Sequence, residues 1–90
     1  MASQSESPGI TLIVTDDRPI SVKFAETMLE NDAYGIVTTM DGASCIKAAK
    51  RLNPDLILLD VIMTGINGFE VCRILKQDVE TKDIPIIFSQ

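Results

Sequence analysis

The amino-acid sequence predicts an α/β fold, a doubly wound sheet of parallel strands with helices on both faces. Short apolar runs alternate along its 90 residues with longer amphipathic stretches, in the order β-α-β-α-β-α-β. The amphipathic stretches are long enough to be the helical crossovers that parallel strands require. Most of the predicted strands consist of consecutive apolar residues, and strands of that kind are typically covered on both faces.

The first third of the chain contains one predicted strand and one predicted helix. Residues 1–9, MASQSESPG, are small and polar and end in Pro-Gly, so we expect a flexible tail there. Residues 11–15, TLIVT, are expected to form a buried strand. The stretch 18–32 is predicted to be a helix, because Pro19 suits its first turn and the following apolar residues recur at helical spacing.

The remaining elements alternate between strands and helices. Helices are expected at 41–53 and 67–78, where apolar residues again recur every three or four positions. Strands are expected at 35–40, 54–59 and 83–88. The first of these three is the least apolar, because it contains two threonines.

Composition and charge argue against several classes of function. A nucleic-acid interface needs clustered Lys and Arg, whereas this chain has a net charge of −5. The sequence has no His, and its two cysteines, Cys45 and Cys72, form no CxxC pair, so neither a zinc site nor thiol catalysis is expected. No apolar run approaches the length of a membrane span and no signal-peptide pattern opens the chain, so we expect a cytoplasmic protein without a membrane partner.

Three carboxylates stand at the ends of two predicted strands. Asp16 and Asp17 follow strand 11–15, and Asp60 follows strand 54–59. In an open parallel sheet, ligands bind beyond the carboxyl ends of the strands, so these side chains converge if the two strands are neighbours. Converging carboxylates repel one another unless a cation joins them, and Arg18 is the basic residue that could swing in. A site made only of oxygen ligands suits Mg²⁺.

Asp60 has a second feature that a metal site alone does not explain. It is followed by the glycine-containing loop VIMTGINGFE, which exposes it beside a flexible backbone and the expected metal. This arrangement suits a carboxylate nucleophile in phosphoryl transfer, which would form an aspartyl phosphate. The alternative is that these aspartates only cap helices or form turns, as Asp commonly does.

Four segments point to a family. LIVTDDRP, MDGASCIKAAK, PDLILLDVIMTGINGFEVCRILK and IPIIF together resemble the receiver domain of two-component response regulators, over residues 10–90. The resemblance implies a flavodoxin-like parallel sheet with strand order 2-1-3-4. It also implies that Asp60 accepts a phosphoryl group from the phosphohistidine of a sensor histidine kinase or phosphotransfer protein, in a signalling domain that is not an enzyme. Kinase docking is expected on the helix from Pro19 to Asn31.

The resemblance also implies a ligand set for the metal. Asp17 and Asp60 are expected to hold Mg²⁺ together with the backbone carbonyl of Ile62, while Asp16 acts mainly through water. These assignments follow from matching the segments above to the family pattern.

The chain departs from the family pattern in three respects. The family has five strands and five helices, whereas this chain stops after the fourth strand, so we expect a receiver domain truncated at its C-terminus. The switch Thr or Ser position of the family falls on Gln90, or on Ser89 if the alignment slips by one residue. Thr64 stands where the family usually has Pro, which we expect to loosen the loop after Asp60.

The missing elements would leave strand 83–88 with an apolar edge that is open to pairing with another chain. We therefore expect either a fragment of a longer receiver domain or a homodimer, formed through this edge or by exchange of elements between two copies. The alternative to a phosphoacceptor is a scaffold with a receiver-like fold that dimerises through this edge without being phosphorylated. For the phosphoacceptor, the output would be altered protein–protein contact.

Overall fold

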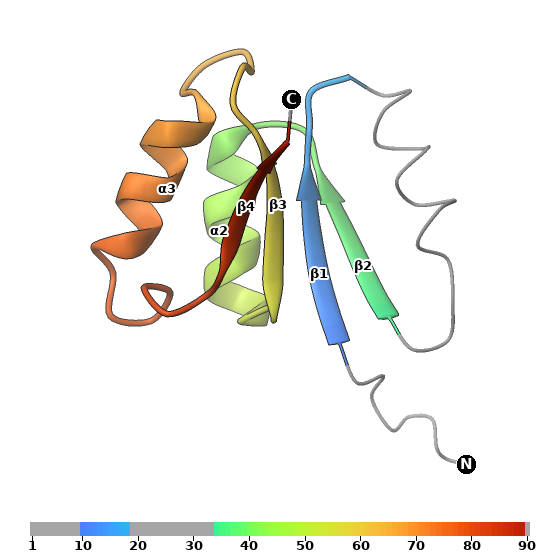
Figure 1. The fold of residues 1–90 in the computed structure, drawn as a ribbon, viewed down its shortest axis with the longest axis vertical. Helices are drawn as coiled ribbons and strands as arrows, with labels where there is room; N and C mark the ends of the chain where they lie inside the picture. Colours follow the sequence, from blue (N-terminus) through green and yellow to red (C-terminus); the bar gives the residue numbers. More distant parts are fainter. Residues whose placement is uncertain (1–9, 19–33, 90) are drawn as a thin grey trace.

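The computed structural model of the chain describes residues 10–18 and 34–89 (Figure 1). Within them, four strands form one parallel sheet in the order β2-β1-β3-β4. The strands are β1 Ile10–Thr15, β2 Tyr34–Thr39, β3 Leu56–Asp60 and β4 Ile86–Ser89. The predicted parallel sheet and strand order are therefore confirmed. The predicted tail at 1–9, nearly all of the predicted helix at 18–32, and Gln90 lie outside the described residues.

Two helices pack together against one face of this sheet (Figure 1). Helix α2, Gly42–Leu52, follows β2, and helix α3, Gly68–Lys76, follows β3, close to the predicted bounds. Alternate residues of β1 and β3 pack against these two helices, because successive side chains of a strand point to opposite faces of the sheet. The buried core on this face includes Ile13, Ile57, Leu59, Cys45, Ala49, Val71 and Leu75.

In the described part of the chain, no helix is both long enough and apolar enough to cross a membrane.

The strands differ in how far they are covered. On the opposite face of β1, Leu12 and Val14 are also buried, as the consecutive apolar residues predicted. On β4, Ile87 is 53% exposed and Phe88 is 37% exposed, which agrees with the open apolar edge expected for strand 83–88. The reason is position, since β4 is the edge strand of the described sheet and pairs there only with β3.

Polar side chains fix where both helices begin. The Asp41 side chain accepts a hydrogen bond from the Ser44 backbone N–H at 2.8 Å, and this bond lowers the pKa of Asp41. The Asn67 side chain accepts from the Glu70 backbone N–H at 2.9 Å. Each of these bonds satisfies an N–H group that the first helical turn leaves without a partner. The two caps therefore fix the ends of α2 and α3 that lie nearest the carboxyl edge of the sheet.

Replacing Asn67 with Ala should lower the free energy of unfolding by about 1 kcal/mol, because the first turn of α3 loses its cap. Urea denaturation followed by circular dichroism would measure the change. Asn67→Asp retains an acceptor oxygen and should stay close to the wild-type midpoint. Equal losses in the two variants would mean that the cap bond does not stabilise α3.

Candidate functional site

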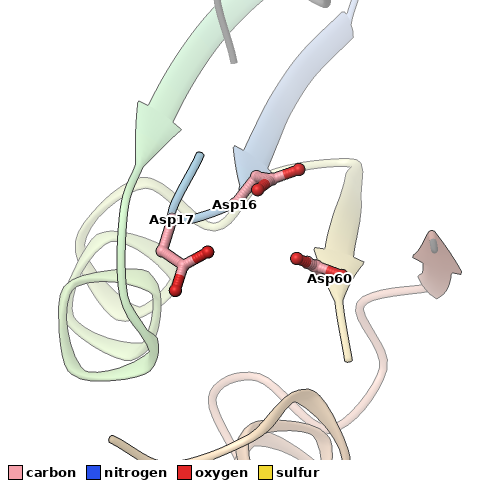
Figure 2. Close-up of side chains that lie close together, drawn as sticks. All are labelled: Asp16, Asp17 and Asp60. Atoms are coloured by element: carbon pink, nitrogen blue, oxygen red, sulfur yellow. The ribbon is translucent and has the colours of Figure 1, made fainter. Parts of the chain in front are cut away.

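The carboxyl ends of β1 and β3 bring three aspartates together (Figure 2). The two strands are parallel neighbours, with Thr15 opposite Leu59, so the residues that follow these two lie side by side. One carboxylate oxygen from each of Asp16, Asp17 and Asp60 can be chosen so that all three lie within 4.8 Å of one another. Asp16 is 6% exposed and Asp60 is 4% exposed. The predicted convergence of the three carboxylates is therefore confirmed.

Arg18 neutralises part of this negative charge. Its Nε donates to Oδ1 of Asp16 at 3.0 Å and its Nη2 donates to Oδ2 at 3.0 Å, so the guanidinium binds both carboxylate oxygens. Nη2 also lies 3.6 Å from Oδ2 of Asp60. Burial alone would raise the pKa of Asp16, but the hydrogen bonds and positive charge of Arg18 outweigh it and the pKa is lowered. The sequence had identified Arg18 as the basic residue within reach.

Asp17 is held by the loop that follows β3. Its Oδ2 accepts hydrogen bonds from the Thr64 backbone N–H at 2.9 Å and from the Thr64 hydroxyl at 3.2 Å. Proline could not donate the first of these bonds, because it has no backbone N–H. The expectation that Thr64 loosens the loop is therefore wrong, because Thr64 ties the loop to β1. Thr64 stands out in the sequence as a departure from the family pattern, but the sequence does not reveal its partner, Asp17, which lies 47 positions away.

The loop between Asp60 and α3 is held by two close backbone contacts. The Gly68 N–H donates to the Val61 carbonyl at 2.7 Å. A Cβ at Gly68 would lie 2.4 Å from the Asp60 carbonyl oxygen and 2.8 Å from the Val61 Cα, closer than real atoms approach. Gly65 makes the turn between these points with φ of +86°, a conformation that favours glycine. The start of α3 is thereby packed directly against the backbone of Asp60.

A cleft of about 540 Å³ opens beside the aspartates and is lined by Asp17, Arg18, Asp60, Val61, Ile62 and Phe69. Ile62, whose backbone carbonyl the resemblance assigned to the metal, is among these residues, and its side chain is exposed. Phe69 lies in edge contact with Phe88 of β4, with ring centroids 5.0 Å apart. The sequence did not single out this aromatic pair, whose members come from different elements and carry no local signal.

One of the two candidate switch residues, Ser89, is the last residue of β4. Ser89 pairs with Asp60 in the β3–β4 register, so their side chains point to the same face of the sheet. Ser89 is exposed. Gln90 lies outside the described residues, so the choice between the two stays a prediction.

The donor atoms of the acidic cluster fit a hard divalent cation. Carboxylate oxygens are the ligands that Mg²⁺ prefers, and a site with few protein ligands suits an ion that keeps several waters. No His or Cys belongs to this cluster, so the softer metals that those side chains select are not favoured. The buried carboxylate of Asp60 also borders the open cleft, where an incoming group has room.

Comparisons with known proteins identify the class to which this arrangement belongs. The family described as the response regulator receiver domain matches residues 12–89. Response regulator PleD of Caulobacter vibrioides is 43% identical over 76 residues, which are 84% of this chain and 17% of PleD. The N-terminal domain of a response regulator receiver protein from Methanoculleus marisnigri has a TM-score of 0.84 at 38% identity, covering 88% of this chain and 64% of that one.

A third similar protein bears on the acidic cluster. The receiver domain of the sensor histidine kinase PA1611 from Pseudomonas aeruginosa was solved with a magnesium ion coordinated in its active site cleft. Its TM-score with this chain is 0.83 at 25% identity, over 89% of this chain and 66% of that one.

The chain belongs to the response regulator receiver domain family. Domains of this family act in two-component signalling, are phosphorylated on an aspartate, and are not enzymes in the usual sense. The chain spans less than two thirds of the length of each of the three proteins compared above.

Replacing Gly68 with Ala should lower the free energy of unfolding by about 3 kcal/mol, because the new methyl group would overlap the backbone of Asp60 and Val61. Gly65→Ala is the matched control. It places a methyl group in open space at a positive φ, so only a backbone cost of about 1 kcal/mol is expected. Urea denaturation would compare the two variants, and a loss at Gly68 no larger than that at Gly65 would contradict the close packing described above.

Proposed function

We propose that this chain is the phosphoacceptor module of a two-component phosphorelay and that Asp60 receives the phosphoryl group. The observation that carries the proposal is the buried Asp60 carboxylate, which converges with Asp16 and Asp17 beside an open cleft. Three carboxylates at such short range favour the binding of a divalent cation, because each would otherwise repel the others. A structural cap or turn would not require all three to meet.

In the proposed reaction, a carboxylate oxygen of Asp60 attacks the phosphorus of a phosphohistidine. The new O–P bond makes an aspartyl phosphate, the P–N bond breaks, and its electron pair returns to the imidazole of the donor. Asp17, Asp60 and the backbone carbonyl of Ile62 would hold Mg²⁺, and Asp16 would act mainly through water. Bound Mg²⁺ would neutralise the negative charge of the transferring phosphoryl oxygens.

The remaining protein residues would position these groups. Thr64 holds one carboxylate oxygen of Asp17 in place, so that its other oxygen is available for a cation. Gly68 lets α3 approach closely and so limits movement of the Asp60 backbone. Ser89, opposite Asp60 in the register, or Gln90 would respond to the phosphoryl group as the switch position. Phosphorylation would then shift the population between two conformations and change protein–protein contacts.

The proposed partner is a sensor histidine kinase or a phosphotransfer protein, in agreement with the partners of receiver domains in general. We also propose a cytoplasmic location. Both cysteines are free, Cys45 buried and Cys72 half-buried, as is usual in a reducing compartment.

Incubation with acetyl phosphate and Mg²⁺ should add one phosphoryl group to the chain, detected by intact mass. Asp60→Asn should abolish the adduct, because an amide lacks the nucleophilic carboxylate oxygen. Asp83→Asn removes the same charge from an exposed position near the amino end of β4, so this variant should be labelled like the wild type. Absence of an adduct in the wild type, or its persistence in Asp60→Asn, would refute the phosphoacceptor assignment.

The alternative function, an unphosphorylated scaffold, has less support because it leaves the convergence of the three aspartates without a purpose. Homodimer formation is compatible with either function. The exposed Ile87 and Phe88 on β4 would provide the apolar contact, and the free strand edge would provide backbone hydrogen bonds.

If this edge pairs, the elution volume of the 90-residue chain in size-exclusion chromatography should decrease as concentration rises. Ile87→Lys should keep the chain monomeric, because a charge on an edge strand opposes pairing. A monomeric wild type at every concentration would refute the homodimer.

A further inference from the structure

Arg18 makes more contacts with the acidic cluster than a simple surface ion pair would. Its backbone N–H donates to Oδ1 of Asp16 at 2.9 Å, in addition to the two hydrogen bonds from the guanidinium. The same guanidinium lies 3.6 Å from Oδ2 of Asp60. Arg18 therefore places its positive charge between two of the three carboxylates that would surround a divalent cation.

The backbone contact and the side-chain contacts of Arg18 differ in how easily they can be released. The backbone N–H of Arg18 is only two residues from Asp16 and holds that side chain in a local turn. The Arg18 side chain is 57% exposed, whereas the side chains of Asp16 and Asp60 are 9% and 6% exposed. The guanidinium can therefore move into solvent without disturbing the core, while the carboxylates stay in place.

The positive charge of Arg18 stabilises the acidic cluster without a metal and opposes the arrival of a second cation. A guanidinium stays protonated throughout the physiological range, and its neighbours Asp16, Asp60 and Asp17 raise the pKa of Arg18 further. It relieves repulsion among the carboxylates when no metal is bound. A divalent cation arriving among these carboxylates is repelled by the guanidinium, and water bound to the cation would replace the Arg18 hydrogen bonds to Asp16.

We propose that Arg18 is a built-in competitor of the divalent cation: it holds Asp16 and Asp60 together in the metal-free state and is displaced when Mg²⁺ binds. Arg18 thereby sets the Mg²⁺ concentration at which Asp60 becomes competent for phosphorylation. This inference rests on the proposed function, because it assumes that the acidic cluster is a Mg²⁺ site.

Isothermal titration with MgCl₂ would test the competition directly in the wild type and in Arg18→Ala. Removing the guanidinium should lower the Kd for Mg²⁺ by about twofold to fivefold, the range expected for the loss of a partly exposed ion pair. Arg18→Lys keeps the charge but loses the two-point contact, so its Kd should fall between the other two. Arg51→Ala is the matched control. It removes the same charge from the exposed end of α2, far from the carboxyl edge of the sheet, and should leave the Kd unchanged.

A second measurement would test the metal-free state. In EDTA, Arg18→Ala should melt at a lower temperature than the wild type, because the carboxylates lose their counter-charge, and saturating Mg²⁺ should remove most of that difference. An Arg18→Ala variant that melts below the wild type in EDTA, but close to it in saturating Mg²⁺, therefore supports the inference. Equal melting temperatures in EDTA would contradict it.

The possible outcomes separate this inference from the proposed function. If both proteins bind Mg²⁺ and the Kd of Arg18→Ala is unchanged or higher, the competition is refuted while the metal site stands. If Arg18→Ala binds and the wild type does not, the inference is supported in its strongest form. If neither protein binds Mg²⁺, the metal site and the competition both fail.

Discussion

Parallel pairing of β1 with β3 in one fixed register is the constraint on which the site depends. Because Thr15 lies opposite Leu59, the carboxylates that follow are forced together in a nearly buried position. Two like charges at short range with little water around them destabilise the fold unless a cation compensates. Arg18 provides that compensation within the chain. The need for a counter-charge is thus a consequence of the sheet register.

Several hydrogen bonds hold the loop from Asp60 to α3 in place, and this loop presents the Asp60 carboxylate. It is anchored at Asp17 through Thr64, at Val61 through Gly68, and at its end through the Asn67 cap. The first anchor ties the loop to the residue after β1 and the other two tie it to the start of α3, so movement of the loop would have to break several hydrogen bonds together. A carboxylate presented by such a loop keeps its geometry before any ligand arrives, which lowers the reorganisation needed for reaction.

The same register connects the site to the edge of the described sheet. Asp60 lies opposite Ser89, and Phe88 next to Ser89 contacts Phe69 on α3. A change in charge at Asp60 therefore occurs one strand away from the most exposed apolar residues of β4. This proximity gives a physical route by which the proposed phosphorylation of Asp60 would alter the exposed surface of β4.

The sequence by itself determined the order of the described strands and helices, the parallel sheet and the placement of Asp16, Asp17 and Asp60 at strand ends, because apolar periodicity and strand ends are local features. Only the tertiary structure decided the contact of Phe69 on α3 with Phe88 on β4, since the two residues lie on different elements and carry no local signal. It also decided the partners of the carboxylates. Thr64 reaches Asp17 across 47 residues of sequence, and no local pattern encodes a contact that exists only after β1 and β3 have paired.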